Sequence, residues 1–132
     1  MKAILLLLGI NLPALCAAAQ QQANQASTFN PMYIERNVFH LKFGASRDAL
    51  PLWREYLQRT QKRDPALHVR LMTDVSGPAY ALIVEISYES FAEMDPSQCR
   101  LTNQVDWKEF YQKFIPFCEK AERTYYKVQL SF

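Results

Sequence analysis

The sequence contains little glycine, cysteine or histidine, and this scarcity excludes several classes of site. There are 3 glycines, 3 cysteines and 2 histidines among 132 residues. No glycine-rich phosphate loop, dinucleotide fingerprint or Ser-His-Asp order is present. Neither His40 nor His68 belongs to a closely spaced pair, and the cysteines form no C-x-x-C motif. We therefore expect no metal site and no cofactor.

Charge of one sign is not in excess either. The chain has 15 basic and 13 acidic side chains, a formal net charge of +2 and no run of like charges. Proteins that bind nucleic acids or anionic membrane surfaces usually carry a basic patch or stripe. The balance here predicts no nucleic-acid partner and no membrane-surface partner.

The only long apolar run lies at the beginning of the chain. Residues 1–19 carry one early lysine, an apolar stretch and three alanines of the kind that a signal peptidase accepts. The stretch is short for a membrane span and is interrupted by Asn11 and Pro13. A lipoprotein acylated on Cys16 and a retained anchor are the alternatives, although Leu15 is large for the first. We expect a cleaved signal peptide, a periplasmic or secreted protein, and no membrane association after cleavage.

A polar segment separates this run from the first periodic pattern. Residues 20–30 have no apolar period, so they cannot bury enough surface to offset the entropy lost on ordering. Every aromatic side chain lies from Phe29 onward. We interpret residues 20–35 as a flexible tether and residues 36–132 as a single domain.

Two periodicities alternate along the domain. Alternating apolar and polar residues predict strands over residues 37–43, 68–74, 80–88 and 124–130. Apolar residues that recur every three or four positions predict helices over residues 49–63 and 107–121, with a short helical turn at 90–93. Asp48 is the expected cap of the first long helix, and Pro116 is expected to kink the second.

The order of these elements predicts an α+β, ferredoxin-like βαββαβ fold. Residues 75–78 link the second and third strands closely enough for an antiparallel hairpin. The expected architecture is a four-stranded antiparallel sheet with both helices on one face.

Three segments resemble the dimeric α/β barrel superfamily, in particular its NIPSNAP-like and antibiotic-biosynthesis-monooxygenase-like domains. They are residues 38–44, residues 86–93 and residues 107–126. The resemblance implies a homodimer in which two sheets pair into a barrel. Members of the superfamily include cofactor-free oxygenases, haem-degrading enzymes and proteins without known activity, so the resemblance alone does not choose a function.

One branch of the superfamily can be tested by its residues. The haem-degrading members resemble this chain in having an asparagine in the first strand and a tryptophan on the later helix, which Asn37 and Trp107 match. Those members also use a histidine on that helix, and no histidine follows His68 here. The sequence therefore disfavours the haem branch.

Alternation assigns the residues of the first strand to opposite faces. Phe39, Leu41 and Phe43 are expected toward the helices, which sends His40 and Lys42 to the other face. With an assumed register, the other strands add further residues to this second face: Arg70, Glu85, Tyr125, Lys127 and Gln129. Charge in a dry interior is costly unless it is paired. This face is thus expected to be a solvated surface, a polar dimer interface or a ligand pocket.

A pocket on that face would favour a small anionic ligand. Lys42, Arg70 and Lys127 outnumber Glu85 there, which suits a carboxylate. His40 is the candidate general base, because the usual pKa of histidine, about 6.5, lies near working pH. The candidate ligand-binding residues are Lys42, Arg70, Glu85, Tyr125, Lys127 and Trp107. The alternative is a solvated sheet face with one ion pair.

Aromatic and cysteine residues carry two further expectations. The aromatic stripe is expected to form the core, or in part to wall a cavity for an aromatic ligand, with Trp107 near it. Cys99 and Cys118 are a disulfide candidate in an oxidising compartment; alternatively, Cys118 packs as a small apolar side chain and Cys99 is free.

Three functions fit these observations. The first is a secreted protein that binds a small ligand, either without activity or with weak activity. The second is a cofactor-free, monooxygenase-like enzyme acting on an aromatic compound, with His40 as the base. The third is a structural module whose sheet only dimerises. The sequence leaves open whether the protein is an enzyme.

Overall fold

The computed structural model describes residues 29–76 and 80–131. The expected signal peptide and residues 20–28 of the expected tether lie outside this part of the chain. Within it, no helix has both the length and the apolar character that a membrane crossing requires.

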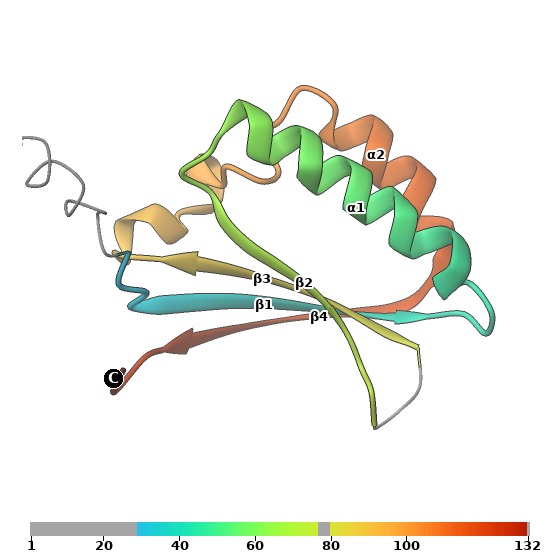
Figure 1. Ribbon diagram of the computed structural model, residues 1–132, viewed down its shortest axis with the longest axis horizontal. Coiled ribbons are helices and arrows are strands. Elements are labelled where there is room, and N and C mark those ends of the chain that lie inside the picture. Colours follow the sequence, from blue (N-terminus) through green and yellow to red (C-terminus); the bar gives the residue numbers. More distant parts are fainter. Residues whose placement is uncertain (1–28, 77–79, 132) are drawn as a thin grey trace, which may run out of the picture.

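The described chain forms one four-stranded antiparallel sheet covered on one face by two helices (Figure 1). The main elements are β1 (Tyr33–Leu41), α1 (Ser46–Arg63), β2 (His68–Thr73), β3 (Ala81–Tyr88), α2 (Trp107–Phe114) and β4 (Cys118–Lys127). Three short 3-10 turns complete the order: η1 (Ala92–Met94), η2 (Pro96–Gln98) and η3 (Ile115–Phe117). The strand order β2-β3-β1-β4 confirms the predicted ferredoxin-like α+β fold.

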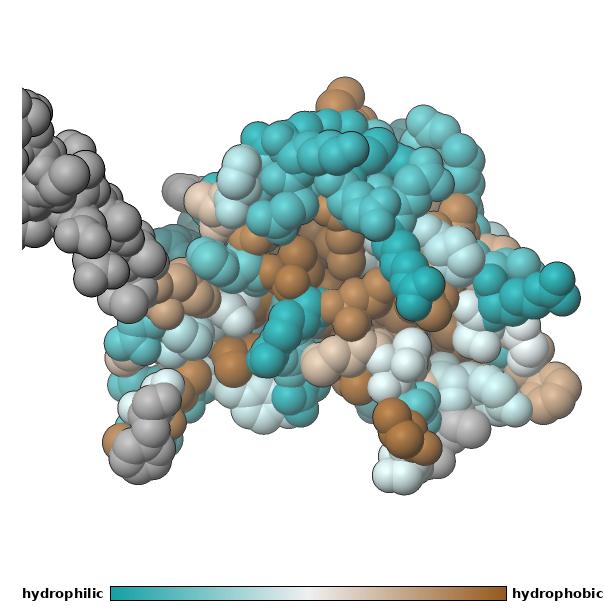
Figure 2. Space-filling view, in the orientation of Figure 1, coloured by the Kyte–Doolittle hydropathy of each residue, from teal (hydrophilic) through white to brown (hydrophobic). Residues whose placement is uncertain are grey.

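The core lies between the helices and one face of the sheet. Apolar residues at alternate positions of β1 and β3 pack against aromatic residues of α1 and α2. Its members include Phe39, Leu82, Val84, Ile86, Trp53, Tyr56, Phe110 and Phe114. Figure 2 shows hydrophobic residues gathered between the helical layer and the sheet, with hydrophilic residues over the outer surface of the helices. Burial of this apolar area is the main stabilising contribution.

The other side of the sheet, which we term the open face, carries no helix. Its residues are Ile34, Arg36, Val38 and His40 of β1, with the residues paired to them on β3 and β4, and His68, Arg70 and Met72 of β2. Arg36, for example, lies opposite Glu85 on one side and Thr124 on the other. The predicted placement of His40, Arg70 and Glu85 away from the helices is therefore correct.

The register assumed for the last strand was wrong. Tyr125 and Lys127 pair with Glu35 and Tyr33, so both point to the helix side of the sheet rather than to the open face. Gln129 lies beyond the end of β4. An irregularity between His40 and Leu41 shifts the pairing with β4, and alternation within one strand cannot reveal such a shift.

The second helix is shorter than its apolar period predicts. It ends at Phe114 instead of continuing to residue 121, and β4 already begins at Cys118. Pro116 has no N–H to donate, and it lies in the 3-10 turn that follows the helix. The proline therefore ends the helix rather than kinking it.

The first strand and the first helix also differ from expectation at their ends. β1 begins at Tyr33, so part of the expected tether belongs to the sheet, and it ends at Leu41. Phe43 consequently lies beyond the strand and is 87% exposed instead of facing the helices. Gly44 then adopts a positive φ of 76°, which glycine tolerates without a steric cost. Helix α1 begins at Ser46, and Asp48 lies in its first turn rather than at the cap.

Candidate functional site

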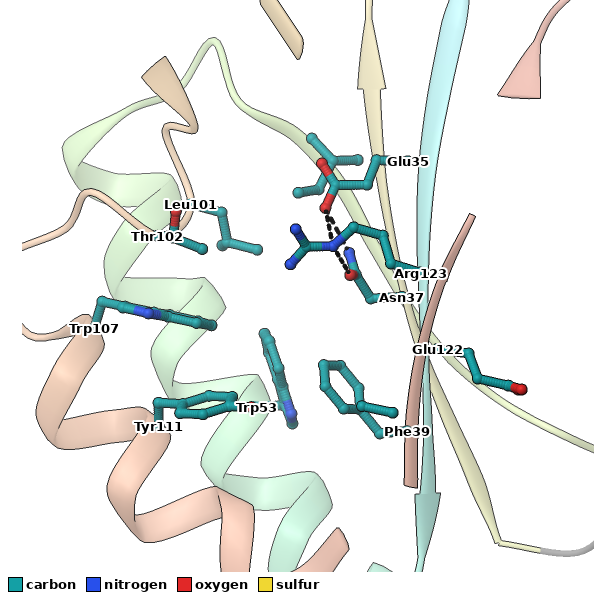
Figure 3. Close-up of a pocket in the computed structure, with 12 residues that line it drawn as sticks. Glu35, Asn37, Phe39, Trp53, Leu101, Thr102, Trp107, Tyr111, Glu122 and Arg123 are labelled. Carbon is teal, nitrogen blue, oxygen red and sulfur yellow. Dashed lines mark hydrogen bonds and ion pairs between the residues drawn. The ribbon is translucent and has the colours of Figure 1, made fainter. Parts of the chain in front are cut away.

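A cavity of about 510 Å³ lies between α2 and the sheet (Figure 3). Its floor comes from β1 and β4, and its other walls come from α1, from the first residues of α2 and from the loop at Leu101 and Thr102. Small-molecule sites usually have volumes of about 300–1,000 Å³. Other hollows exist in the described part of the chain, but this one combines aromatic walls with the buried carboxyl side chain of Glu35.

Aromatic side chains line much of this cavity. Trp107 and Tyr111 lie one turn apart on α2 and stack with their ring centroids 5.2 Å apart. Trp53 of α1 and Phe39 of β1 complete the wall, with centroids 5.5 Å apart. Trp53 and Phe39 are buried, whereas Trp107 and Tyr111 are half-buried. A planar ligand would thus meet rings on several sides.

The sheet side of the same cavity carries a polar cluster. Asn37 donates from Nδ2 to Glu35 Oε1 at 2.9 Å, and the Tyr88 hydroxyl donates to Glu35 Oε2 at 2.9 Å. Arg123 of β4 donates from Nε to Asn37 Oδ1 at 2.8 Å, and the same nitrogen lies 3.2 Å from Glu35 Oε1. Because residues two apart on a strand share a face, Glu35 and Asn37 reach the same spot as Arg123.

Burial makes this cluster costly unless it is complete. Glu35 is 4% exposed and Asn37 is 8% exposed. A carboxylate at such a position costs several kcal/mol unless it is paired and hydrogen-bonded. Both oxygens of Glu35 have donors, so its charge is compensated. Burial, followed by the nearby Glu35 carboxylate, raises the pKa of the Tyr88 hydroxyl, which therefore stays protonated and donates.

Arg123 presents its outer edge to the cavity. Its guanidinium points from β4 toward Thr102 and Trp107 (Figure 3). The contacts of Arg123 with Asn37 and Glu35 use Nε, and the Tyr125 side chain also interacts with the guanidinium. Among the described residues, no acidic side chain forms an ion pair with Nη1 or Nη2. Burial lowers the pKa of Arg123, but Glu35 and Tyr125 together outweigh this effect, so the pKa is raised overall. Asn37 and Glu35 thus position the guanidinium through Nε, and its two terminal nitrogens point into the cavity.

A second polar network holds the roof of the cavity. Asp106, just before α2, accepts from Arg63 Nη1 at 2.6 Å and from Arg59 Nε at 3.1 Å. These arginines, with Arg63 first, hold the pKa of the Asp106 carboxyl at about 2. The Tyr56 hydroxyl donates to the Leu101 carbonyl, and burial raises its pKa to about 12. Both contacts tie the loop and the start of α2 to α1.

His40 lies outside this cavity. It is on the open face, where Nε2 lies 2.9 Å from Glu122 Oε2. Lys120 also pairs with Glu122, whose side chain points away from the cavity in Figure 3. The structure thus places the candidate base in a half-exposed hydrogen bond with Glu122, on the side of the sheet opposite the aromatic walls.

Arg70 and Glu85 are together on the open face, as expected. Glu85 accepts from Arg70 Nη2 at 2.6 Å and from Arg36 Nε at 2.6 Å. Glu85 is 1% exposed, because the two arginines and the sheet cover it. This trio satisfies its own charges, so it is an ion-pair cluster rather than an open anion site.

The remaining candidate residues are dispersed. Lys42 is exposed beyond the end of β1, and Lys127 is exposed at the end of β4. Tyr125 lines a different hollow, beside Phe91 and Pro96. Trp107 alone among the six candidate ligand-binding residues lines the cavity.

Sequence reasoning missed Glu35 and Arg123 as site residues and named Asn37 only for the haem comparison. A signal was present for two of them. If the alternation that buries Phe39 and Leu41 is extended backward, Asn37 and Glu35 fall at buried positions. Two polar residues in an apolar row indicate a buried polar cluster.

The two cysteines are free thiols, so the candidate disulfide is not formed in this structure. Cys118 lies opposite Leu41 at one end of β1, whereas Cys99 lies near Tyr88, toward the other end. Both pack against the core. Within residues 29–76 and 80–131, no group of three or more His, Cys, Asp or Glu side chains could hold a metal ion.

No family model and no curated protein sequence matches the chain. Solved structures do share its fold. An uncharacterised NIPSNAP domain protein from Burkholderia xenovorans aligns with a TM-score of 0.63 at 18% identity, over 76% of this chain and 97% of that one. A NIPSNAP family protein from Agrobacterium tumefaciens aligns with a TM-score of 0.63 at 19% identity, over 78% of this chain and 91% of that one. An antibiotic biosynthesis monooxygenase aligns with a TM-score of 0.57 at 15% identity, over 74% of this chain and 98% of that one. These similarities establish the ferredoxin-like fold that NIPSNAP and antibiotic-biosynthesis-monooxygenase-like proteins share.

Proposed function

We propose that this protein binds a small planar ligand in the cavity between α2 and the sheet. The observation that carries the proposal is a polar cluster, in which buried Glu35 and Asn37 pair with the exposed Arg123, beside the aromatic walls of the cavity. A purely structural core gains little from a charged cluster, because apolar residues of similar volume pack there as well or better. The position of the cluster supports a binding site on the helix side of the sheet, not on the open face.

The test is a native mass spectrum of the protein purified from the compartment in which it accumulates, followed by the Trp107→Ala variant. We expect extra non-covalent mass on the wild-type protein and its loss in the variant, because Trp107 forms part of the wall. Phe43→Ala removes an exposed aromatic ring outside the cavity and is the matched control. Bare wild-type protein, together with no stabilisation by any aromatic compound in thermal unfolding, would contradict the proposal.

A cofactor-free oxygenase acting on an aromatic compound is the second candidate. It is favoured by the Glu35 carboxylate, which could accept a proton inside an aromatic-walled cavity, and by the fold shared with an antibiotic biosynthesis monooxygenase. Oxygen uptake with phenolic compounds tests it. Glu35→Gln should abolish uptake, while His40→Ala, on the far side of the sheet, should leave it unchanged.

We also propose that the open face pairs with a second copy of the chain. Val38 and Ile83 form an apolar patch there, flanked by charges of both signs. Such a face can complement itself about a two-fold axis. Light scattering should give twice the chain mass for the wild-type protein and the mass of one chain for Val38→Glu. A monomeric wild-type protein would overturn this proposal, and with it both the structural dimer and the paired barrel.

Export to the periplasm or the medium is proposed from the sequence of residues 1–19. N-terminal sequencing of the protein recovered from the cell envelope tests it directly. We expect the mature chain to begin at Gln20, and a retained Met1 would exclude cleavage at this site.

A further inference from the structure

We infer that the ligand of the cavity is an aromatic carboxylate and that Arg123 binds its carboxylate group. The inference rests on the proposed function, since it concerns the same cavity, and it adds the chemical class of the ligand. Three properties of the site lead to it: the edge of the guanidinium that points into the cavity, the absence of an acid in front of that edge, and the aromatic walls of the same cavity.

The first property is the orientation of Arg123. Its Nε is occupied by Asn37 and Glu35, so the group cannot rotate to use that nitrogen for a ligand. Nη1 and Nη2 form the remaining edge and point into the cavity (Figure 3). A guanidinium edge of this kind donates two parallel hydrogen bonds to the two oxygens of one carboxylate. A single carbonyl or hydroxyl group uses only one of them.

The second property is the charge around that edge. Both oxygens of Glu35 accept hydrogen bonds from Asn37, Arg123 and Tyr88, so this carboxylate lies behind the guanidinium and not across the cavity from it. Glu122 points away from the cavity. The group facing Arg123 across the gap is Thr102, whose hydroxyl can add one neutral donor. Nη1, Nη2 and the Thr102 hydroxyl thus provide three donors, which suits the two oxygens of one carboxylate.

A phosphate ester fits the same donors less well. Its dianion usually draws on several cationic or backbone donors. In the described residues that line this cavity, Arg123 is the only cationic side chain. A monoanionic carboxylate is therefore favoured over a dianionic phosphate.

The third property is the shape of the rest of the cavity. Trp107 and Tyr111 present half-buried ring surfaces, and Phe39 closes the opposite side. With about 510 Å³ available, one or two fused rings attached to the carboxylate can be accommodated. The Arg123 side chain is 53% exposed, so a ligand stacked against these rings would cover part of it and strengthen the ion pair.

The test measures the binding of three probes to the full protein by calorimetry: 2-naphthoate, 2-naphthamide and 2-naphthyl phosphate. We expect the carboxylate to bind at least tenfold more tightly than the amide, since hydrogen bonds between charged groups contribute more than neutral ones. We expect the phosphate to bind more weakly than the carboxylate. In Arg123→Gln the preference for carboxylate over amide should disappear.

The controls separate charge recognition from folding. Arg54→Gln removes an exposed arginine of α1 and should keep the full preference. Arg123→Lys keeps the charge but loses the two-nitrogen edge, so it should retain only part of the preference. If Arg123→Gln does not fold, the comparison of the three probes on the wild-type protein still decides the inference.

The outcomes distinguish the inference from the proposed function. Equal binding of naphthoate and naphthamide, or a preference that survives in Arg123→Gln, overturns the inference while the cavity remains a ligand site. Tighter binding of the phosphate overturns the carboxylate assignment in the same way. No binding of any probe overturns both.

Discussion

Arg123 and Asn37 lie opposite each other in the β1–β4 ladder, and Arg123 Nε donates to Asn37 Oδ1 at 2.8 Å. The amide of Asn37 therefore stands between two charged groups: its oxygen accepts from Arg123, and its nitrogen donates to Glu35. This single side chain fixes both the position of the cavity's cation and the orientation of the buried carboxylate. A leucine or an alanine at the same place could do neither.

The first prediction concerns Asn37. In Asn37→Ala, Glu35 loses one of its donors inside the protein, and Arg123 loses the acceptor that orients it. Leaving a buried polar group unsatisfied costs about 1–3 kcal/mol, so the free energy of unfolding in urea should fall by about that amount. Asn103→Ala removes a comparable amide at an exposed position, where Nδ2 donates to the Ser97 carbonyl, and should cost clearly less. Equal losses for the two variants would contradict the role assigned to Asn37.

The second prediction concerns pH. Because Arg63 and Arg59 hold the folded-state pKa of Asp106 at about 2, below its usual value of 3.8, the pairing stabilises the fold above pH 4. This stability should be lost as the pH falls from about 4 to about 2. Asp106→Asn should lower the free energy of unfolding by about 1 kcal/mol at pH 7, as expected for a mostly surface-located pair. Near pH 2 the wild-type protein and the variant should be equally stable.

The control for Asp106 is Glu109→Gln. Glu109 lies in the first turn of α2 and pairs with Lys113 at a fully exposed site, so its removal should change stability less at pH 7. A difference between wild type and Asp106→Asn that persists unchanged at pH 2 would rule out the ion pairs as its source.

The third prediction concerns the thiols. Burial raises the pKa of Cys118 to about 11. The thiolate is the reactive form, so at pH 8 Cys118 should react with iodoacetamide on the order of a hundredfold more slowly than an unperturbed thiol with a pKa of about 8.5. Cys99→Ser isolates this reaction for measurement by mass spectrometry. Unfolding without reductant should make both thiols of the wild-type protein reactive; if neither reacts then, the two are joined by a disulfide.

The fourth prediction concerns the open face. Glu85 is buried, whereas the side chains of Arg36 and Arg70 are 42% and 64% exposed. Glu85→Gln leaves two arginines that water can still solvate. The double variant Arg36→Gln, Arg70→Gln leaves a buried carboxylate without a cation, which typically costs about 3–5 kcal/mol. Chemical unfolding should therefore show a larger loss for the double variant than for Glu85→Gln, and the reverse order would refute the account of this trio.

Much of the fold follows from local patterns in the sequence. The alternation around Phe39 and Leu41 and the helical spacing of Trp53, Tyr56 and Phe110 each report which side of an element is buried. The order of the elements then leaves few possible topologies. The strand order, the hairpin pairing of β2 with β3 and the helix-covered face could all be predicted for this reason.

The site could not be predicted in the same way, because it depends on how distant segments align. Whether Tyr125 or Thr124 faces the helices is decided by the pairing of β4 with β1, including an irregularity beside His40. The apolar pattern predicts a helix through Pro116, but the helix ends at Phe114 and Pro116 lies in the 3-10 turn that follows. Both uncertainties fall on the segment that supplies Arg123, so the central cation of the cavity was missed.

The imino acid at position 116 thus influences the chemistry of a cavity whose wall it does not form. If α2 continued to residue 121, the segment from Cys118 to Arg123 would be wound in or just after a helix and could not extend along β1. Asn37 and Glu35 would then face the helices without the guanidinium that donates to Asn37 and pairs with the Glu35 carboxylate. The residues that form the floor of the cavity are thus determined partly by where α2 ends. An insertion or deletion between Phe114 and Cys118 would place a different residue of the last strand opposite Asn37 without changing any residue that lines the cavity.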